Sequence, residues 1–301
     1  MNKTKSLIIA LVFIFSLILL GSSAFAQGGS SAFGQNYRET SSVGYHSMGW
    51  DTFEAGWLIG HRVYGPQGGG EIGQIEDLMI DRANGHVVFV ILSGVPGLGA
   101  EFVAAPFSAL ERTGEDTFQL NLGDWDTSQW YWNATNVALS TIPSTIDPLW
   151  ADSVYEFYGQ KPYWTEGREV PPDIMSYRAA RSFILESLLM GKTAPVLIGA
   201  TVQSKDRRGV AGIDDLVVDS KDGRVAFLVL DGVPGRGDSQ VAVPFDELSM
   251  SGNAFVLNTT GEKLAAAPAF NEGSDMGNRE YAAGVYMFFG LQPYWAQEQI
   301  R

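Results

Sequence analysis

The chain contains no cysteine among its 301 residues. Thiol catalysis, cysteine metal sites and disulfide bonds are therefore excluded. The stability of any fold must come from the burial of apolar side chains, and a chain of this length can bury a sizeable core without covalent cross-links.

Residues that commonly perform catalysis are scarce or lack a recognisable arrangement. The three histidines, His46, His61 and His86, share no metal-like spacing, and no Ser-His-Asp pattern accompanies them. The glycine-rich segment 94–99 precedes a predicted strand instead of a helix, and it lacks the Lys-Ser/Thr pair of a phosphate-binding loop. The sequence therefore predicts a protein that is not an enzyme and binds no cofactor.

Basic residues are outnumbered, with 20 lysines and arginines against 34 acidic residues and a formal net charge of −14. A negative field of this kind repels nucleic-acid phosphates and anionic lipid headgroups. We therefore expect no nucleic-acid partner. A cation, a basic protein surface or a neutral ligand remains compatible with the charge.

The only long apolar run lies at the N-terminus. Lys3 and Lys5 precede the apolar segment 7–20, and the small residues Ala24 and Ala26 follow it at the positions that a signal peptidase reads. The run is about 14 residues long, which is short for a membrane span of about 20. We predict a signal peptide over 1–26, cleaved after Ala26, and a periplasmic or secreted protein. The alternative is an uncleaved anchor, the one case in which we expect membrane contact.

An internal duplication is the main positive feature of the sequence. Five short motifs occur twice in the same order: Leu58-Ile59-Gly60 and Leu197-Ile198-Gly199, Glu76-Asp77-Leu78 and Asp214-Asp215-Leu216, Gly94-Val95-Pro96-Gly97 and Gly232-Val233-Pro234-Gly235, Pro106-Phe107 and Pro244-Phe245, and Pro162-Tyr163-Trp164 and Pro293-Tyr294-Trp295. Matches in one order indicate two copies of one domain.

Each copy contains five or six short runs with strand character, separated by glycine-rich turns. In the first copy the clearest are 71–81, with a shift of rhythm near Gly73, and 86–93; in the second they are 210–219 and 224–230. Short strands at this spacing predict a mainly β fold of two tandem, small antiparallel barrels.

The rest of the chain completes the predicted organisation. Residues 27–55 are rich in Gly, Ser, Gln and Asn, which predicts a flexible lead-in. We expect domains at 56–165 and 195–301, each with an aromatic tail. Between them, in the linker 166–194, apolar residues recur at helical spacing and predict one amphipathic α-helix over about 173–190.

The repeated pattern resembles the PRC-barrel family. The resemblance lies in Leu-Ile-Gly, a glycine-broken strand, Glu/Asp-Asp-Leu-x-x-Asp, a glycine turn and a Val/Phe-rich strand that leads to Val-Ala-x-Pro-Phe, at 58–107 and again at 197–245. The resemblance implies a small β-barrel that acts as an adaptor or scaffold, binding another macromolecule without chemistry. It implies no catalytic residues.

Acidic residues recur beside one turn of each copy: Glu76, Asp77 and Asp81, and Asp214, Asp215 and Asp219. Carboxylates at this spacing could bind Ca²⁺ or Mg²⁺, with Asp77, Asp81, Asp215 and Asp219 as weak candidate ligands. No Asp-x-Asp-x-Asp-Gly loop is present, however. The simpler interpretation is that Asp81 and Asp219 cap the backbone of the following hairpin.

Candidates for binding another protein lie mostly in aromatic segments and in the unrepeated parts. They are Trp125, Trp130 and Trp132, in an insertion that the second copy is predicted to lack; the tail residues Tyr163, Trp164, Tyr294 and Trp295; and Arg236, which replaces Leu98. Packing onto their own barrel is the simpler explanation of the tails and of the three tryptophans. We expect an exported interaction module that binds another protein; the alternative is a cation- or small-ligand-binding protein. The sequence does not indicate an oligomeric state.

Overall fold

The computed structural model describes residues 51–99, 101–140, 147–164, 174–177, 197–252 and 254–297. All of them belong to one compact unit, 45–301. The signal-peptide prediction therefore lies outside the described residues. None of the helices in the described ranges is both long and apolar enough to cross a membrane.

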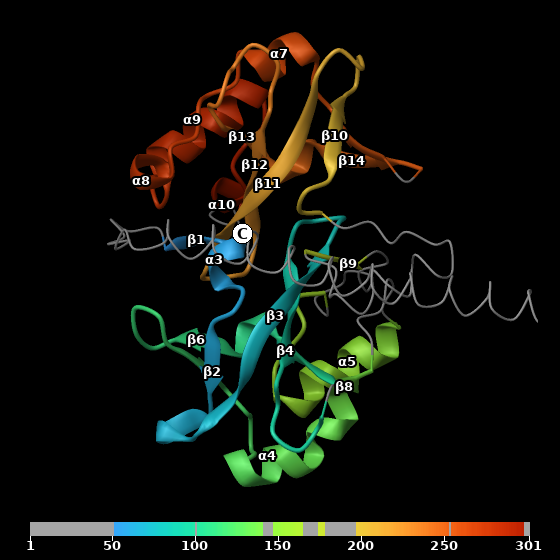
Figure 1. The fold of residues 1–301 in the computed structure, drawn as a ribbon, viewed down its shortest axis with the longest axis vertical. Helices are drawn as coiled ribbons and strands as arrows, with labels where there is room; N and C mark the ends of the chain where they lie inside the picture. The colour runs from blue at the N-terminus through green and yellow to red at the C-terminus, as the bar shows by residue number, and fades with distance from the viewer. Residues whose placement is uncertain are drawn as a thin grey trace, which may run out of the picture. The chain divides into compact units, whose positions relative to one another are not determined.

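The first repeat forms one sheet with the order β6-β7-β2-β3-β4-β5-β8 (Figure 1). Its strands are β2 (Arg62–Tyr64), β3 (Glu71–Asp81), β4 (Val87–Ser93), β5 (Phe102–Pro106), β6 (Leu110–Arg112), β7 (Phe118–Leu120) and β8 (Ala138–Leu139). All described pairs in this sheet are antiparallel except β2 and β7, which run parallel.

The second repeat forms a separate sheet with a corresponding strand order, β13-β12-β11-β10-β15-β14. Its strands are β10 (Thr201–Ser204), β11 (Val210–Asp219), β12 (Val225–Asp231), β13 (Val241–Pro244), β14 (Leu248–Ser251) and β15 (Ala254–Leu257). β10 and β15 form the parallel pair here. The mainly β, tandem fold is thus confirmed, and the parallel pair in each copy is a feature that the sequence did not predict.

The long strand of each copy has the bounds that the sequence predicted, Glu71–Asp81 and Val210–Asp219. Its register against the next strand shifts between Ile75 and Asp77 in the first copy, and between Ile213 and Asp215 in the second. The shift turns the side chain of each aspartate inward, and Asp77 and Asp215 are both buried. A bulge at this position therefore places a carboxylate in the core.

Short helices surround the sheets. The first copy has α3 (Ala55–Leu58), α4 (Thr127–Asn133) and α5 (Pro148–Phe157), with 3-10 turns η1 (Pro66–Gly68), η2 (Phe107–Ala109) and η3 (Ala134–Val137); the second has η4 (Phe245–Glu247), α7 (Gly261–Ala265), α8 (Glu272–Asp275), α9 (Arg279–Phe289) and α10 (Tyr294–Gln297). Helix α9 buries one face, which includes Ala282, Val285, Tyr286 and Phe289.

Two short strands cross from one repeat to the other. β1 (Thr52–Glu54) precedes the first repeat but pairs with β11 of the second, and β9 (Ile174–Ser176) precedes the second repeat but pairs with β3 of the first. The registers correspond, because Thr52 lies opposite Asp219 and Ile174 lies opposite Asp81. Each barrel therefore completes its sheet with a strand from the segment that leads into its neighbour.

These crossing strands differ from the sequence prediction. β1 falls in the predicted lead-in, and β9 occupies the start of the predicted linker helix; the remainder of that helix lies outside the described residues. Both strands have three residues, too few to show a period, and the pairing that forms them comes from distant chain.

Candidate functional site

The two repeats meet through their corresponding turns. The Val87 N–H donates to the Gly223 carbonyl at 2.8 Å, and the Val225 N–H donates to the Gly85 carbonyl at 2.8 Å. Each turn is therefore bonded to the other in the same way, as two identical subunits are bonded across a two-fold axis.

Aromatic rings close over the glycines of these turns. A Cβ atom built on Gly223 would lie 2.6 Å from the Phe107 ring, and one built on Gly85 would lie 2.8 Å from the Phe245 ring. Both glycines have left-handed backbone, with φ of +73° and +74°. The turn and the close approach of the other barrel thus both require glycine.

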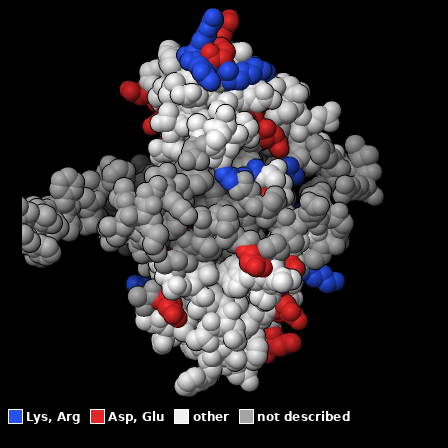
Figure 2. All heavy atoms as spheres, turned by 90° about the vertical axis from the view of Figure 1, so that its right-hand side faces the viewer, with Lys and Arg blue, Asp and Glu red and all other residues white. Residues whose placement is uncertain are grey.

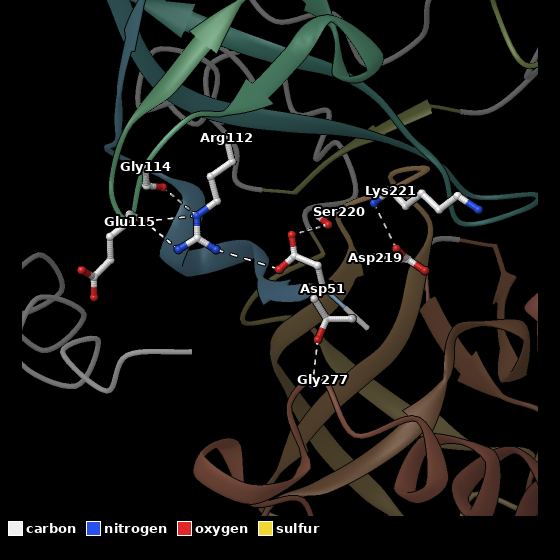
Figure 3. Close-up of polar contacts among 9 residues, drawn as sticks. Asp51, Arg112, Gly114, Glu115, Asp219, Ser220, Lys221 and Gly277 are labelled. Atoms are coloured by element: carbon white, nitrogen blue, oxygen red, sulfur yellow. Dashed lines mark hydrogen bonds and ion pairs between the residues drawn. The ribbon is translucent and has the colours of Figure 1, made fainter. Parts of the chain in front are cut away.

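Strand β1 is fixed to the second repeat by side chains as well as by its ladder (Figure 3). The Gly277 N–H donates to the Thr52 hydroxyl at 2.9 Å, and the Ser220 hydroxyl donates to the Asp51 carboxylate at 2.8 Å. From the first repeat, the Arg112 guanidinium approaches Asp51 at 4.0 Å, and it also donates to the Glu115 carbonyl at 2.6 Å. Asp51 therefore lies between groups of both barrels.

The buried Asp215 carboxylate joins both crossing segments. It accepts hydrogen bonds from the Gly56 N–H, which follows β1, at 3.0 Å, and from the Tyr177 hydroxyl, which follows β9, at 2.9 Å. It also accepts from the Leu216 N–H at 2.7 Å. Burial raises the pKa of Asp215 to about 7, although these hydrogen bonds act in the opposite direction. Asp215 therefore holds together the segments that follow β1 and β9, where the two repeats meet.

The second aspartate of each pair caps its turn, as the sequence predicted. Asp81 accepts from the Ala83 N–H at 2.9 Å, and Asp219 accepts from the Lys221 N–H at 3.0 Å. The other carboxylate oxygen of each receives a tail hydroxyl: Tyr163 donates to Asp81 at 2.8 Å, and Tyr294 donates to Asp219 at 2.8 Å. One aspartate thus joins the turn to the aromatic tail in both repeats.

The Pro-Tyr-Trp tails fold back onto their own barrels. Tyr294 and Trp164 are 2% and 3% exposed, and Tyr163 and Trp295 are partly buried. Preceding tyrosines extend the contact, because Tyr155 donates to the Val88 carbonyl and Tyr286 donates to the Ala226 carbonyl, each at 3.1 Å. The packing interpretation accounts for both tails, so little of Trp164 and Tyr294 is accessible to a partner.

The Tyr294 to Asp219 bond gives a stability prediction. Tyr294→Phe should lower the free energy of unfolding by about 1–3 kcal/mol, because a buried carboxylate loses a donor that water cannot replace. Tyr281→Phe is the matched control, since its hydroxyl donates to the Ala269 carbonyl in an exposed position. Urea unfolding of both variants measures the difference, and equal losses would contradict the buried role of Tyr294.

The acidic residues do not assemble into a cation site in the described ranges. No group of three or more potential ligands there has metal-like proximity. Asp77 accepts from the Leu78 N–H at 2.8 Å, Glu76 accepts from the Ser93 hydroxyl, and Asp214 accepts from Gln240. The repeated acids are therefore accounted for by hydrogen bonds of the fold.

The three tryptophans of the segment 124–133 have different surroundings. Trp125 donates its indole N–H to the Phe157 carbonyl at 3.0 Å, and Trp130 is fully buried. Trp132 is 84% exposed. Trp130 and Trp132 are two positions apart on α4, so helix geometry directs them to different faces. Only Trp132 of the three offers a large free surface.

The prediction that the second copy lacks an insertion equivalent to 124–133 is wrong, because the second copy also has helices there. Helices α7 and α8 occupy the equivalent stretch between β15 and α9, and the pairing of Val103 with Ala138 recurs as a bridge between Val241 and Ala269. Both copies thus have a helical connection, and only its tryptophans are unique to the first.

Arg236 and Leu98 occupy corresponding loops with the same backbone. The Leu98 N–H donates to the Val95 carbonyl at 3.2 Å, and the Arg236 N–H donates to the Val233 carbonyl at 3.1 Å. Both side chains are partly buried. The loops share a turn and differ in the side chain that they carry.

The two β-sheets have corresponding strand orders, turns and tails, and they exchange corresponding strands. The structure is therefore a tandem duplication of one small β domain. The PRC-barrel domain family model matches residues 51–123 and again 193–264. The chain contains two PRC-barrel domains in tandem. A search of curated proteins found no match.

Proposed function

We propose that the protein is a non-enzymatic interaction module of the cell envelope that binds another protein through the helical connection of its first barrel, whose tryptophans the second barrel lacks. The observation that supports this proposal is Trp132, which is 84% exposed on a short but well-capped helix. The side chain of Asp126 accepts from the Gln129 N–H at 2.8 Å, and Gln129 returns a bond to the Asp126 N–H. This capping box holds α4 in place.

The remaining conspicuous residues have roles in the fold, which favours a surface over a catalytic site. The paired aspartates bond to turns, to tails and to the segments that follow β1 and β9, and Trp125 and Trp130 pack within their own barrel. A large exposed aromatic side chain is a common anchor of protein interfaces. Leu149 at the start of α5 is also 80% exposed.

A photo-crosslinking residue at position 132 tests the proposal in intact cells. We expect a discrete protein adduct from position 132 and none from position 287, where Met287 is 69% exposed on the tail helix α9. The adduct should contain a chain that begins at Gln27, as export with cleavage after Ala26 requires. Absence of an adduct at 132, or the same adducts from both positions, would contradict the proposal.

A further inference from the structure

The turn between β10 and β11 concentrates positive charge on an acidic protein. Lys205, Arg207 and Arg208 lie between Ser204 and Gly209, and all three are exposed. We name these three residues the basic turn. The chain as a whole has a net charge of −14. Figure 2 shows lysine and arginine atoms gathered at the upper end of the molecule, with Asp and Glu atoms among them, where Figure 1 places α7 and the end of β10.

The one acid of the turn, Asp206, is itself exposed, and it forms hydrogen bonds within the turn and to α7. Asp206 accepts from the Ser204 hydroxyl at 2.6 Å and from the Gly261 N–H, the first residue of α7, at 2.9 Å. The Ser204 hydroxyl also accepts from the Gly209 N–H at 2.8 Å. Hydrogen bonding, that of Ser204 first, lowers the pKa of Asp206. These bonds fix the backbone, while the side chains of the basic turn have no ion-pair partner among the described residues.

Arg207 occupies a backbone conformation that ordinarily favours glycine, with φ of +59°. Counted from the equivalent Val63 and Val202, it corresponds to Gly68 of the first repeat, where φ is +78°. The first repeat has no charge in this turn, whose sequence is Gly65-Pro66-Gln67-Gly68-Gly69-Gly70. The second copy therefore places an arginine in left-handed backbone where the first copy has glycine, although Gln67 beside it in the first copy also has a positive φ, of +56°.

The charge and the exposed position of the basic turn are best matched by a planar anionic surface. The three cations project from the tip of one hairpin, and the guanidinium groups match phosphate oxygens in pairs. Val210, beside the turn, is 42% exposed and adds apolar surface. Cations near an anionic bilayer contribute about 1 kcal/mol each, within a Debye length of about 8–10 Å. The acidic body is repelled by the same surface, so binding through the turn also orients the protein.

We propose that the basic turn is a membrane-contacting surface that binds the phosphate headgroups of an anionic lipid bilayer. The net charge of the whole chain argues against such contact. Salt screens charges that lie more than about 8–10 Å from the bilayer, however, so the charges of the basic turn determine the interaction. The signal peptide predicted over 1–26 takes the chain across a membrane before its removal, so the protein that begins at Gln27 is released at a membrane surface. An acidic protein segment and free phosphate are the competing ligands, and the test distinguishes them.

Flotation of the chain that begins at Gln27 with vesicles tests the proposal. Phosphatidylcholine vesicles measure the binding that does not depend on lipid charge, and vesicles with about 40% phosphatidylglycerol add the anionic charge. We expect binding to rise on the anionic vesicles and this gain to disappear at about 0.5 M salt. The variant Lys205→Gln/Arg207→Gln/Arg208→Gln should lose the gain by at least tenfold. Arg62→Gln/Lys161→Gln/Lys221→Gln loses equal charge at exposed positions elsewhere and should retain it.

One further variant separates binding from folding. Arg207→Gly should raise the melting temperature, because glycine adopts the left-handed backbone freely, yet lower the anionic gain about fivefold. Equal behaviour of the two triple variants would overturn the proposal. So would competition by millimolar inorganic phosphate, which indicates a free-anion site, or by a polyglutamate peptide with no response to vesicle charge, which indicates an acidic protein partner.

Discussion

Gly223→Ala is expected to lower the free energy of unfolding by about 2–4 kcal/mol, more than any ordinary surface substitution. About 1 kcal/mol comes from placing alanine at φ of +73°, and the rest from the contact of its Cβ with the Phe107 ring of the other barrel at 2.6 Å. Gly85→Ala should behave alike, because its Cβ would meet the Phe245 ring at 2.8 Å.

Gly235→Ala is the matched control for this prediction. Gly235 has φ of +84°, and a Cβ there would meet no atom within 4 Å, so this variant should show the backbone cost alone. Urea unfolding of the three variants measures the difference. Equal losses in Gly223→Ala and Gly235→Ala would mean that Phe107 moves aside freely and that the barrels are not closely packed there.

The second large effect concerns pH. Burial, followed by the neighbouring charges of Asp215, Glu272 and Asp214, raises the pKa of Glu54 from 4.5 to about 9. The folded chain therefore retains a proton that the unfolded chain releases above pH 4.5. Stability from this group is complete below that pH and is lost as the pH rises toward 9. We expect the free energy of unfolding to fall by at least about 1–2 kcal/mol between pH 5 and 9.

Glu54→Gln isolates the contribution of this group. The amide carries no charge at any pH, so the variant should be more stable than the unmodified protein at pH 8–9 and should show a flatter profile. Glu101→Gln, at an exposed position, is the control and should leave the profile unchanged. Urea midpoints across the pH range give the answer, and a rise of stability with pH in the unmodified protein would refute the assignment.

Local patterns in the sequence predicted the parts of the fold that depend on local chemistry. The bounds of β3 and β11 follow from glycines and turn residues at their ends, and the capping by Asp81 and Asp219 follows from their place before a hairpin. The duplication itself predicted that each feature would occur twice, as the tails confirm.

Long-range contacts could not be predicted in the same way. The bond from Gly56 to Asp215 joins residues 159 positions apart, so no local period reveals it. β1 and β9 exist only because the neighbouring barrel offers an open stretch of β11 and β3. Trp130 and Trp132 are a different case, since their spacing on a helix could have separated the buried side chain from the exposed one.

The exchange of β1 and β9 has an evolutionary consequence. In a symmetric homodimer, every substitution appears on both subunits, so a new surface cannot arise on one side alone. Two barrels in one chain that exchange strands retain the interface of a dimer while each copy mutates separately. Arg207, which takes the place that Gly68 has in the first copy, and Trp132, which only the first copy has, are such differences. Duplication within one chain therefore permits the two barrels to differ while the exchanged strands still join them.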